Sequence, residues 1–303
     1  MPALTVRPFH RDDRDQLTEL VNQHVAAVVP GVSVSVNTVL SSLERQPDEF
    51  ITDSWVAERV TLVAEQRHSV VAAAHLLRYR AHADVGEDYR DAGGINWFVC
   101  RPAASFWPDS GEAAQLLMSA CLAQLARWNV RTRHASGDLP APAVYGLPRN
   151  WPHIRALYED AGFRHVGDTE VILIAHTSDL PAPEPRPGVT AERTLGESGT
   201  RCTAYADGQP LGYIEVDTAL SRPERHTRPT GLADIGNLHI AGTHHGQALE
   251  HWLLGQAAHW LRLCGADRLI AYERSTDQTA IDLLLTAGFQ ELTRTDRGWE
   301  HST

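Results

Sequence analysis

The chain has 303 residues, of which 43 % are hydrophobic, and its formal net charge at pH 7 is -11. A chain of this length and apolar content can bury the cores of two soluble domains. All 27 basic residues are arginine, and the negative balance disfavours nucleic-acid binding while it favours cationic partners. No apolar run approaches the roughly 18 residues of a membrane span, so we expect a cytoplasmic protein without membrane contact.

The first half begins with two predicted helices. Apolar side chains recur at helical spacing over residues 12–28, where Asp12 and Asp13 suit a helix N-terminus. A second helix is expected over residues 35–45. Residues 94–100 have the pattern of a buried central strand, and residues 112–128 repeat apolar side chains at i, i+3, i+4 and i+7, which predicts the following helix. A last helix, over residues 154–163, ends in Gly-Phe.

The Pro-rich residues 178–188 predict an exposed, semi-stiff linker, and the second half follows it. Strands are expected over residues 201–205, 212–217, 233–240, 267–272 and 291–295, with helices starting near residues 246 and 279. Gly288 stands where a helix end favours the left-handed conformation. Because both halves share the order strand, helix and helix ending in Gly-Phe, the sequence predicts an imperfect repeat. The second half lacks the two opening helices.

The most informative stretch, residues 233–254, is typical of a strand, a short glycine-containing loop and the first turns of an amphipathic helix. The unpaired N–H groups and positive dipole end of such a helix can hold a phosphate or diphosphate without any lysine. Gly246 lets the backbone come close to the anion, and the small Ala248 leaves room beside it.

Thr243-His-His-Gly-Gln-Ala248 resembles the cofactor loop of the GNAT superfamily of acyl-CoA-dependent N-acyltransferases, Arg/Gln-x-x-Gly-x-Gly/Ala after the central strand. Thr243 stands where the family prefers Arg or Gln, and His244 and His245 can partly replace that charge. The order of elements in both halves is also similar to the family. The resemblance therefore implies an α/β (α+β) fold of two tandem GNAT-like domains, each a mixed twisted sheet flanked by helices. The expected limits are 1–177 and 189–303, with linker 178–188 and a second domain truncated at its start.

This resemblance implies an N-acetyltransferase that transfers the acetyl group of acetyl-CoA to a primary amine by direct attack on the thioester. The cofactor-binding residues it implies are Leu238, His239, Ile240, His244, His245, Gly246, Gln247, Ala248 and Leu249. In the family, a backbone N–H of the central strand stabilises the oxyanion. That donor is expected at residue 239 or 240, or at Phe98 or Val99 in the first half.

The expected catalytic side chains are Tyr158, Glu215 and Asp234. Tyr158 occupies the position from which the family protonates the departing thiolate, although a tyrosine that simply packs on its helix fits the sequence equally well. The matching residue of the second half is Leu284, which cannot donate a proton. The base is expected among carboxylates at strand ends, namely Glu215, Asp217 and Asp234 in the second half and Glu87 and Asp91 in the first.

The two halves carry complementary parts of the expected site. The first has the acceptor-side helices and Tyr158, but in its longer loop Asp109 and Glu112 would repel a diphosphate. The second half has the compact loop. Acyl-CoA is therefore expected mainly in the second half.

Two other classes of protein have some support in this sequence. A non-catalytic acyl-CoA binding or sensing protein fits the departures from the family's motif. A metal protein built on the histidine-rich run is disfavoured by the lack of His-x-x-x-His or a cysteine pair, so no metal is expected. Four scattered cysteines, Cys100, Cys121, Cys202 and Cys264, are expected to be reduced core residues. The acceptor is expected to be a small-molecule amine or a peptide, and the protein a monomer with an internal pseudo-dimer or a homodimer.

Overall fold

The computed structural model describes residues 4–44, 54–101, 110–218, 231–241 and 247–301. Two compact units are present. Unit 1 is Met1–Thr169 with Thr295–Thr303, and unit 2 is Glu170–Arg294. None of the helices in the described ranges has the length and hydropathy that a membrane crossing needs.

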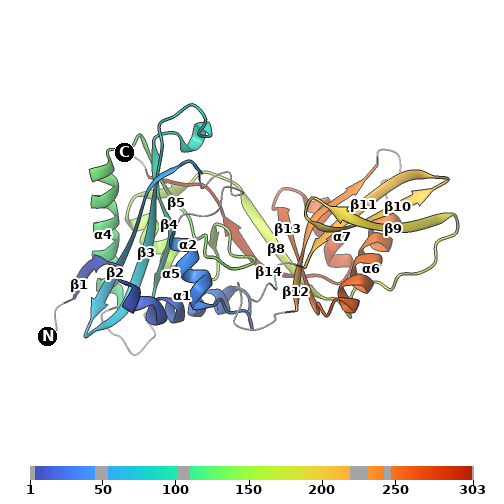
Figure 1. The fold of residues 1–303 in the computed structure, drawn as a ribbon, viewed down its shortest axis with the longest axis horizontal. Coiled ribbons are helices and arrows are strands. Elements are labelled where there is room, and N and C mark those ends of the chain that lie inside the picture. Colours follow the sequence, from blue (N-terminus) through green and yellow to red (C-terminus); the bar gives the residue numbers. More distant parts are fainter. Residues whose placement is uncertain (1–3, 45–53, 102–109, 219–230, 242–246, 302–303) are drawn as a thin grey trace. The chain divides into compact units, whose positions relative to one another are not determined.

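Unit 1 is built on a mixed sheet with the strand order β1-β2-β3-β4-β5-β15-β7. Its strands are β1 (Thr5–Pro8), β2 (Val56–Gln66), β3 (Ser69–Tyr79), β4 (Ala92–Cys100), β5 (Thr132–Ala135), β7 (Phe163–His165) and β15 (Trp299–His301). Only β4 and β5 pair in parallel. Helix α4 (Ser110–Trp128) lies on one side of this sheet, and α1 (Arg14–Val28) and α2 (Val36–Leu43) lie on the other (Figure 1). This two-sided cover explains why every residue of β4 except Asn96 is buried.

The helices and the central strand expected in the first half are confirmed. The 3₁₀ turn η1 (Arg11–Asp13) leads directly into α1, and Ser35 caps α2 by accepting a hydrogen bond from the Thr38 amide at 3.0 Å. The last predicted helix is α5 (Pro152–Asp160), after which Gly162 adopts a φ of +92° and Phe163 is buried. Local sequence signals therefore set these boundaries.

Unit 2 contains the strands β14-β8-β13-β12-β11-β10-β9 in that order, and β12 and β13 pair in parallel. The strands are β8 (Thr169–His176), β9 (Val189–Gly196), β10 (Gly199–Ala206), β11 (Gln209–Asp217), β12 (Leu232–Ile240), β13 (Arg268–Arg274) and β14 (Gln290–Asp296). A short strand, β6 (Leu147–Pro148), pairs with Thr295 and Asp296 at the end of β14. The strands and helices predicted for the second half are confirmed, but β9 was not expected, because its mostly exposed residues give no apolar pattern.

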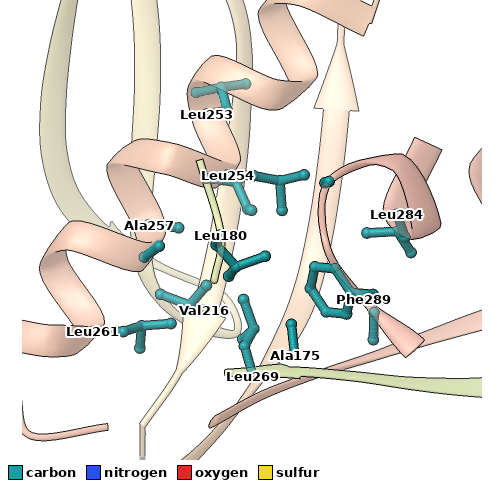
Figure 2. Close-up of a cluster of buried hydrophobic side chains, with 14 of the residues drawn as sticks. Ala175, Leu180, Val216, Leu253, Leu254, Ala257, Leu261, Leu269, Leu284 and Phe289 are labelled. Atoms are coloured by element: carbon teal, nitrogen blue, oxygen red, sulfur yellow. The ribbon is translucent and has the colours of Figure 1, made fainter. Parts of the chain in front are cut away.

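Helices α6 (Gln247–Leu263) and α7 (Gln278–Thr286) share one hydrophobic core in unit 2. Figure 2 shows Leu254 and Leu261 of α6 directed toward the same cluster as Leu284 of α7 and Phe289. No counterpart of α1 and α2 occurs in the described part of unit 2. Gly288, between α7 and β14, has a φ of +110°, so the predicted left-handed helix end is confirmed.

The chain passes between the units twice, and both passages end in a strand of the receiving sheet. β8 pairs antiparallel with β13 in unit 2, while β15 lies between β5 and β7 in unit 1. The compact units therefore do not follow the limits 1–177 and 189–303 expected from the sequence. These limits differ because interstrand hydrogen bonds join segments far apart in the chain, which no local pattern reveals.

The Pro-rich residues 178–188 lie within unit 2 and are mostly exposed. They also pack on α6. Leu180 is buried in the core, and the Trp252 indole N–H donates to the Glu184 carbonyl at 2.8 Å. Cys100, Cys121 and Cys202 are buried free thiols as expected, whereas Cys264 is exposed, because it lies in the turn after α6 where no element covers it.

Candidate functional site

The central strands of unit 1 separate at a fixed point. β4 and β5 pair from Ala92 with Thr132 to Ile95 with Ala135. On the other edge of β4, the register with β3 shifts at Asn96, which has no partner of its own. Such a bulge bends the strand and is common beside binding sites. The sheet of unit 1 therefore opens next to Asn96.

Unit 2 has the same combination of a bulge and an end of parallel pairing in the equivalent strand, β12. The parallel pairing of β12 with β13 ends at Asp234 and Ile270, and the register with β11 shifts at Gly236. Gly236 and Asn96 hold the same position in strands of equal length. The opening of the sheet is therefore a property of both copies.

The pairing of β4 with β3 and of β12 with β11 shows in which direction each of the four main-chain amides expected as oxyanion donors points. The Arg101 amide donates to Val71 of unit 1 at 3.0 Å, and the Ala241 amide donates to Leu211 of unit 2 at 2.8 Å. In antiparallel strands this direction repeats every second residue, so the amides of Val99 and His239 also point to β3 and β11. The amides of Phe98 and Ile240 therefore point to the side where the next strand has separated, and their role as donors stays a prediction.

A cavity of about 520 Å³ lies at the opening in unit 1. Its walls come from β3, β4, β5, the 3₁₀ turn η2 (Glu87–Tyr89) and residues 297–300 near the C-terminus. The polar side chains nearest the opening are Asn96, His134, Ser136 and Asp138. Because residues 297–300 belong to this wall, strand β15, which follows unit 2 in the chain but pairs in the sheet of unit 1, helps to build the site.

Asp138 is a carboxyl group of this cavity whose pKa is raised. Its backbone amide donates to the Asn96 carbonyl at 3.0 Å, and its side chain accepts a hydrogen bond from the Gly146 amide. Burial raises the pKa of Asp138, while the Gly146 hydrogen bond, the Ser136 side chain and the charge of Arg297 oppose that rise. A carboxylate with a raised pKa beside a cavity is suited to accept a proton from a substrate.

Sequence reasoning missed Asp138. It follows the end of β5 by three residues, in a loop whose Ser-Gly-Asp composition is typical of turns, so no spacing distinguished it. The acids expected in the first half, Glu87 and Asp91, do not line the cavity. Asp91 instead has a φ of +55° at the start of β4.

His134 is a second proton-accepting group in the cavity. Its Nδ1 lies 4.0 Å from Oε1 of Glu300, which stands opposite it on β15. Its Nε2 is buried and has no hydrogen-bond partner in the described part of the chain. An unpaired buried nitrogen carries a desolvation cost that a bound polar ligand would relieve.

Tyr158 is fully buried and lies outside the cavity lining. Its hydroxyl donates to the Ser136 carbonyl at 2.7 Å, and its ring lies 5.6 Å from that of Phe163. Burial raises its pKa well above the ordinary value. The Tyr158 hydroxyl therefore donates its proton to a residue of the cavity wall, while Tyr158 itself does not reach the cavity. Its expected role in protonating a thiolate stays a prediction.

The two carboxylates predicted in unit 2 lie in different environments. Glu215 is 1 % exposed, forms an ion pair with Arg201 at 2.6 Å and accepts hydrogen bonds from the amides of Glu197 and Ser198. This set of contacts fixes the β9–β10 turn to β11. Asp234 is half-buried opposite Asp217, and burial together with that neighbouring charge raises its pKa to about 6. Catalysis by either residue stays a prediction.

The predicted cofactor residues fall partly outside the described ranges. These are His244, His245 and Gly246. Thr243 of the same loop and residues 102–109, the longer loop of the first half, also lie outside the described ranges. Of the remainder, Ile240 and Leu249 are buried, Leu238 is half-buried, and His239 and Ala248 are exposed, while Gln247 begins α6. The predicted diphosphate cradle therefore stays a prediction. No group of three or more His, Cys, Asp or Glu side chains in the described ranges is placed to hold a metal ion.

No family model matches this chain, and no curated protein matches it by sequence. Solved structures do match it. A tandem GNAT protein from the clavulanic acid biosynthesis pathway, solved without AcCoA, superposes with a TM-score of 0.63 and 15 % identity over 99 % of both chains. The chain has a tandem GNAT fold.

Two further structures support this fold. A GCN5-related N-acetyltransferase from Sphaerobacter thermophilus has a TM-score of 0.60 at 13 % identity, over 98 % of this chain and 94 % of its own. The GCN5-related glucosamine N-acetyltransferase region of a fungal multi-domain GH3 beta-N-acetylglucosaminidase has a TM-score of 0.63 at 13 % identity, where the match covers 99 % of this chain and 38 % of that one. At such identities the likeness to tandem GNAT proteins concerns the fold, and activity must be argued from the site.

Proposed function

We propose that this protein is an N-acetyltransferase that moves the acetyl group of acetyl-CoA to a primary amine, and that the reaction takes place in unit 1. The observation that carries the proposal is the cavity at the opening of β4 and β5, with the half-buried Asp138 in its wall. The tandem GNAT fold supports the reaction class by analogy, and the acidic net charge is compatible with a cationic acceptor.

Donor and acceptor must meet within about 3–3.5 Å for the amine to attack the thioester. An amine in the cavity lies beside Asn96 and Asp138, so the thioester has to reach the same opening along the free side of β4. There the Phe98 amide is directed to receive the developing oxyanion. This requirement favours unit 1 for the donor as well, in contrast to the expectation from the loop sequences.

The proposed reaction needs few groups. The Asp138 carboxylate takes a proton from the ammonium group, and the neutral amine then forms a bond to the thioester carbon. The tetrahedral intermediate expels the coenzyme A thiolate, which takes the second proton of the nitrogen. The products are the amide and the coenzyme A thiol, and Asp138 then releases its proton to the solvent. Because a thiol has a pKa of about 8.5, the thiolate leaves without a proton from the protein, so the reaction does not depend on Tyr158, whose hydroxyl donates to the Ser136 carbonyl.

Thiol release from acetyl-CoA over a panel of primary amines tests this function. We expect release that depends on the amine and follows saturation kinetics. Binding of acetyl-CoA in calorimetry without release on any amine would support the alternative, a non-catalytic acyl-CoA sensor. A protein that binds no acetyl-CoA would overturn both.

A matched pair of variants tests which unit holds the donor. Gly111→Asp places a carboxylate in the first turn of α4, where an added Cβ meets no atom within 4 Å, and Gly246→Asp places one at the residue that precedes α6 in the sequence. A new negative charge at a helix N-terminus repels a diphosphate bound there. We expect Gly111→Asp to weaken acetyl-CoA binding about tenfold and Gly246→Asp to leave it within about twofold. The reverse order would place the donor in unit 2.

A further inference from the structure

Exposed apolar side chains gather at the mouth of the unit 1 cavity. Seven large hydrophobic side chains are exposed in the described ranges, and three of them, Tyr89, Tyr145 and Val166, line this one cavity. Their exposed fractions are 42 %, 43 % and 62 %. Exposed apolar groups gathered around one cavity indicate a surface that a ligand covers.

Aromatic neighbours hold this rim in place. The ring of Tyr89 lies 5.0 Å from that of Tyr79 at an interplanar angle of 61°, and 6.0 Å from that of Trp55. On the other side, the Arg297 guanidinium lies 6.0 Å from the centre of the Tyr145 ring. The rim is therefore a supported aromatic surface, which binds a flat apolar group with little loss of its own freedom.

The charges of the cavity select a cation. Its lining contains the carboxyl groups of Asp88, Asp138 and Glu300 against one guanidinium, that of Arg297. Asp138 lies at the opening of the sheet, and Asp88 belongs to η2, next to Tyr89. A ligand with one positive end and one apolar end fits this arrangement, with the positive end inside and the apolar end at the rim.

We propose that the acceptor is a small primary amine that carries an aromatic body, with its amino group at Asp138 and its ring between Tyr89, Tyr145 and Val166. This inference rests on the proposed function, because it names the substrate class of the same site. A cavity of about 520 Å³ accommodates a ligand of this size. The competing occupant is an aliphatic diamine, whose second ammonium group would lie at Asp88 or Glu300.

Calorimetry on the full-length protein without an acyl donor separates these ligands. The probes are 2-phenylethylamine, ethylamine and putrescine. We expect 2-phenylethylamine to bind about tenfold or more tightly than ethylamine, since its ring covers apolar surface at the rim. Equal binding of ethylamine, tighter binding of putrescine, or no binding of any probe would overturn the proposal.

Variants of the rim provide the second test. Tyr89→Ala and Tyr145→Ala should each weaken 2-phenylethylamine about fivefold or more and leave ethylamine unchanged. Leu116→Ala is the matched control, because Leu116 is 41 % exposed on α4 and lies outside the cavity. Equal loss for both amines, or the same loss in the control, would contradict a role in recognising the ring.

The failure of this inference and of the proposed function give different results. If 2-phenylethylamine binds as expected but no thiol is released from acetyl-CoA, the proposed transfer reaction is wrong and the proposed binding site is supported. If thiol release is fastest with ethylamine or putrescine, the transfer reaction stands and the aromatic acceptor is overturned.

Discussion

The two units open their central sheets in the same way but surround the opening differently. In unit 1 the bulge at Asn96 adjoins a cavity, helices cover both sides of the sheet, and the C-terminal strand completes one wall. In unit 2 the bulge at Gly236 lies on a strand whose residues 236, 237 and 239 are exposed. The repeated strands thus supply the opening, whereas the parts that are not repeated turn it into a binding site.

The sharpest test of this difference compares one carboxylate in each unit. Asp138→Asn should lower kcat/KM for amine acetylation about 100- to 10,000-fold, because an amide cannot accept the ammonium proton. Asp234→Asn in unit 2 should lower it no more than about threefold. Thiol-release kinetics on both variants, after circular dichroism has shown that they fold, measure the two effects.

The outcome can also reverse the comparison. A large loss in Asp234→Asn with little change in Asp138→Asn would move the reaction to unit 2. The pH dependence gives an independent check. Since burial raises the pKa of Asp138, the acidic limb of kcat/KM should lie above the ordinary aspartate value of about 4 and disappear in Asp138→Asn.

Because β15 lies between β5 and β7, we expect its buried residue Trp299 to stabilise unit 1. Trp299 is 1 % exposed, pairs with Ala135 and His165, and lies 6.2 Å from the ring of Tyr158. Trp299→Ala should lower the free energy of unfolding by about 3–5 kcal/mol. Hydrogen exchange should show the loss in β5 and β7. Loss of protection confined to β10–β13 of unit 2 would contradict the pairing of β15 in unit 1. The control variant is Trp260→Ala, which replaces a half-buried tryptophan of α6 in unit 2.

The two units should respond to acid with opposite signs. Burial lowers the pKa of His24 to about 4 and that of His75 to about 3, both in unit 1. The unfolded chain then binds these protons more readily, so unit 1 loses stability as the pH falls below about 6.5, by about 2 kcal/mol for each histidine between pH 7 and pH 5. In unit 2, burial and neighbouring carboxylates raise the pKa of Asp234 to about 6 and that of Glu273 to about 7.

For these two acids the folded state binds the proton more tightly, so unit 2 gains stability as the pH falls from about 7 toward 4. Hydrogen exchange at pH 5 and pH 7, corrected for the intrinsic rates, resolves the two units. A parallel change in both units would show that the buried histidines do not control the acid response of unit 1.

The smallest expected effects concern the paired helix ends. Gly162→Ala and Gly288→Ala each place a side chain at a positive φ and should cost about 1–2 kcal/mol of unfolding free energy in urea titrations. Gly288→Ala should cost more, because its Cβ would lie 3.0 Å from the Asp179 carbonyl oxygen, whereas that of Gly162 would lie 3.3 Å from the movable His301 ring. Equal costs would mean that the backbone conformation alone sets the penalty.

Local order in this protein could be read from the sequence. The helical spacing of α1, α4 and α6 and the glycines after α5 and α7 all depend on residues within a few positions of one another. The likeness of the two halves could be read as well, since both repeat the same order of elements. These features are local because main-chain conformation and helix packing faces are set by neighbouring residues.

The tertiary structure decided the rest. β15 pairs with β5, and β8 pairs with β13, through main-chain hydrogen bonds. Any sequence can form such bonds, so no residue type in the sequence predicts these pairings. Asp138 acquires its raised pKa only through burial in the folded unit, against the opposing effect of the Gly146 hydrogen bond. Glu215, which the sequence offered as a base, is instead enclosed by Arg201 and two amides. Pairing partners and burial arise from contacts across the fold, and they determine which carboxylates are positioned to act on a substrate.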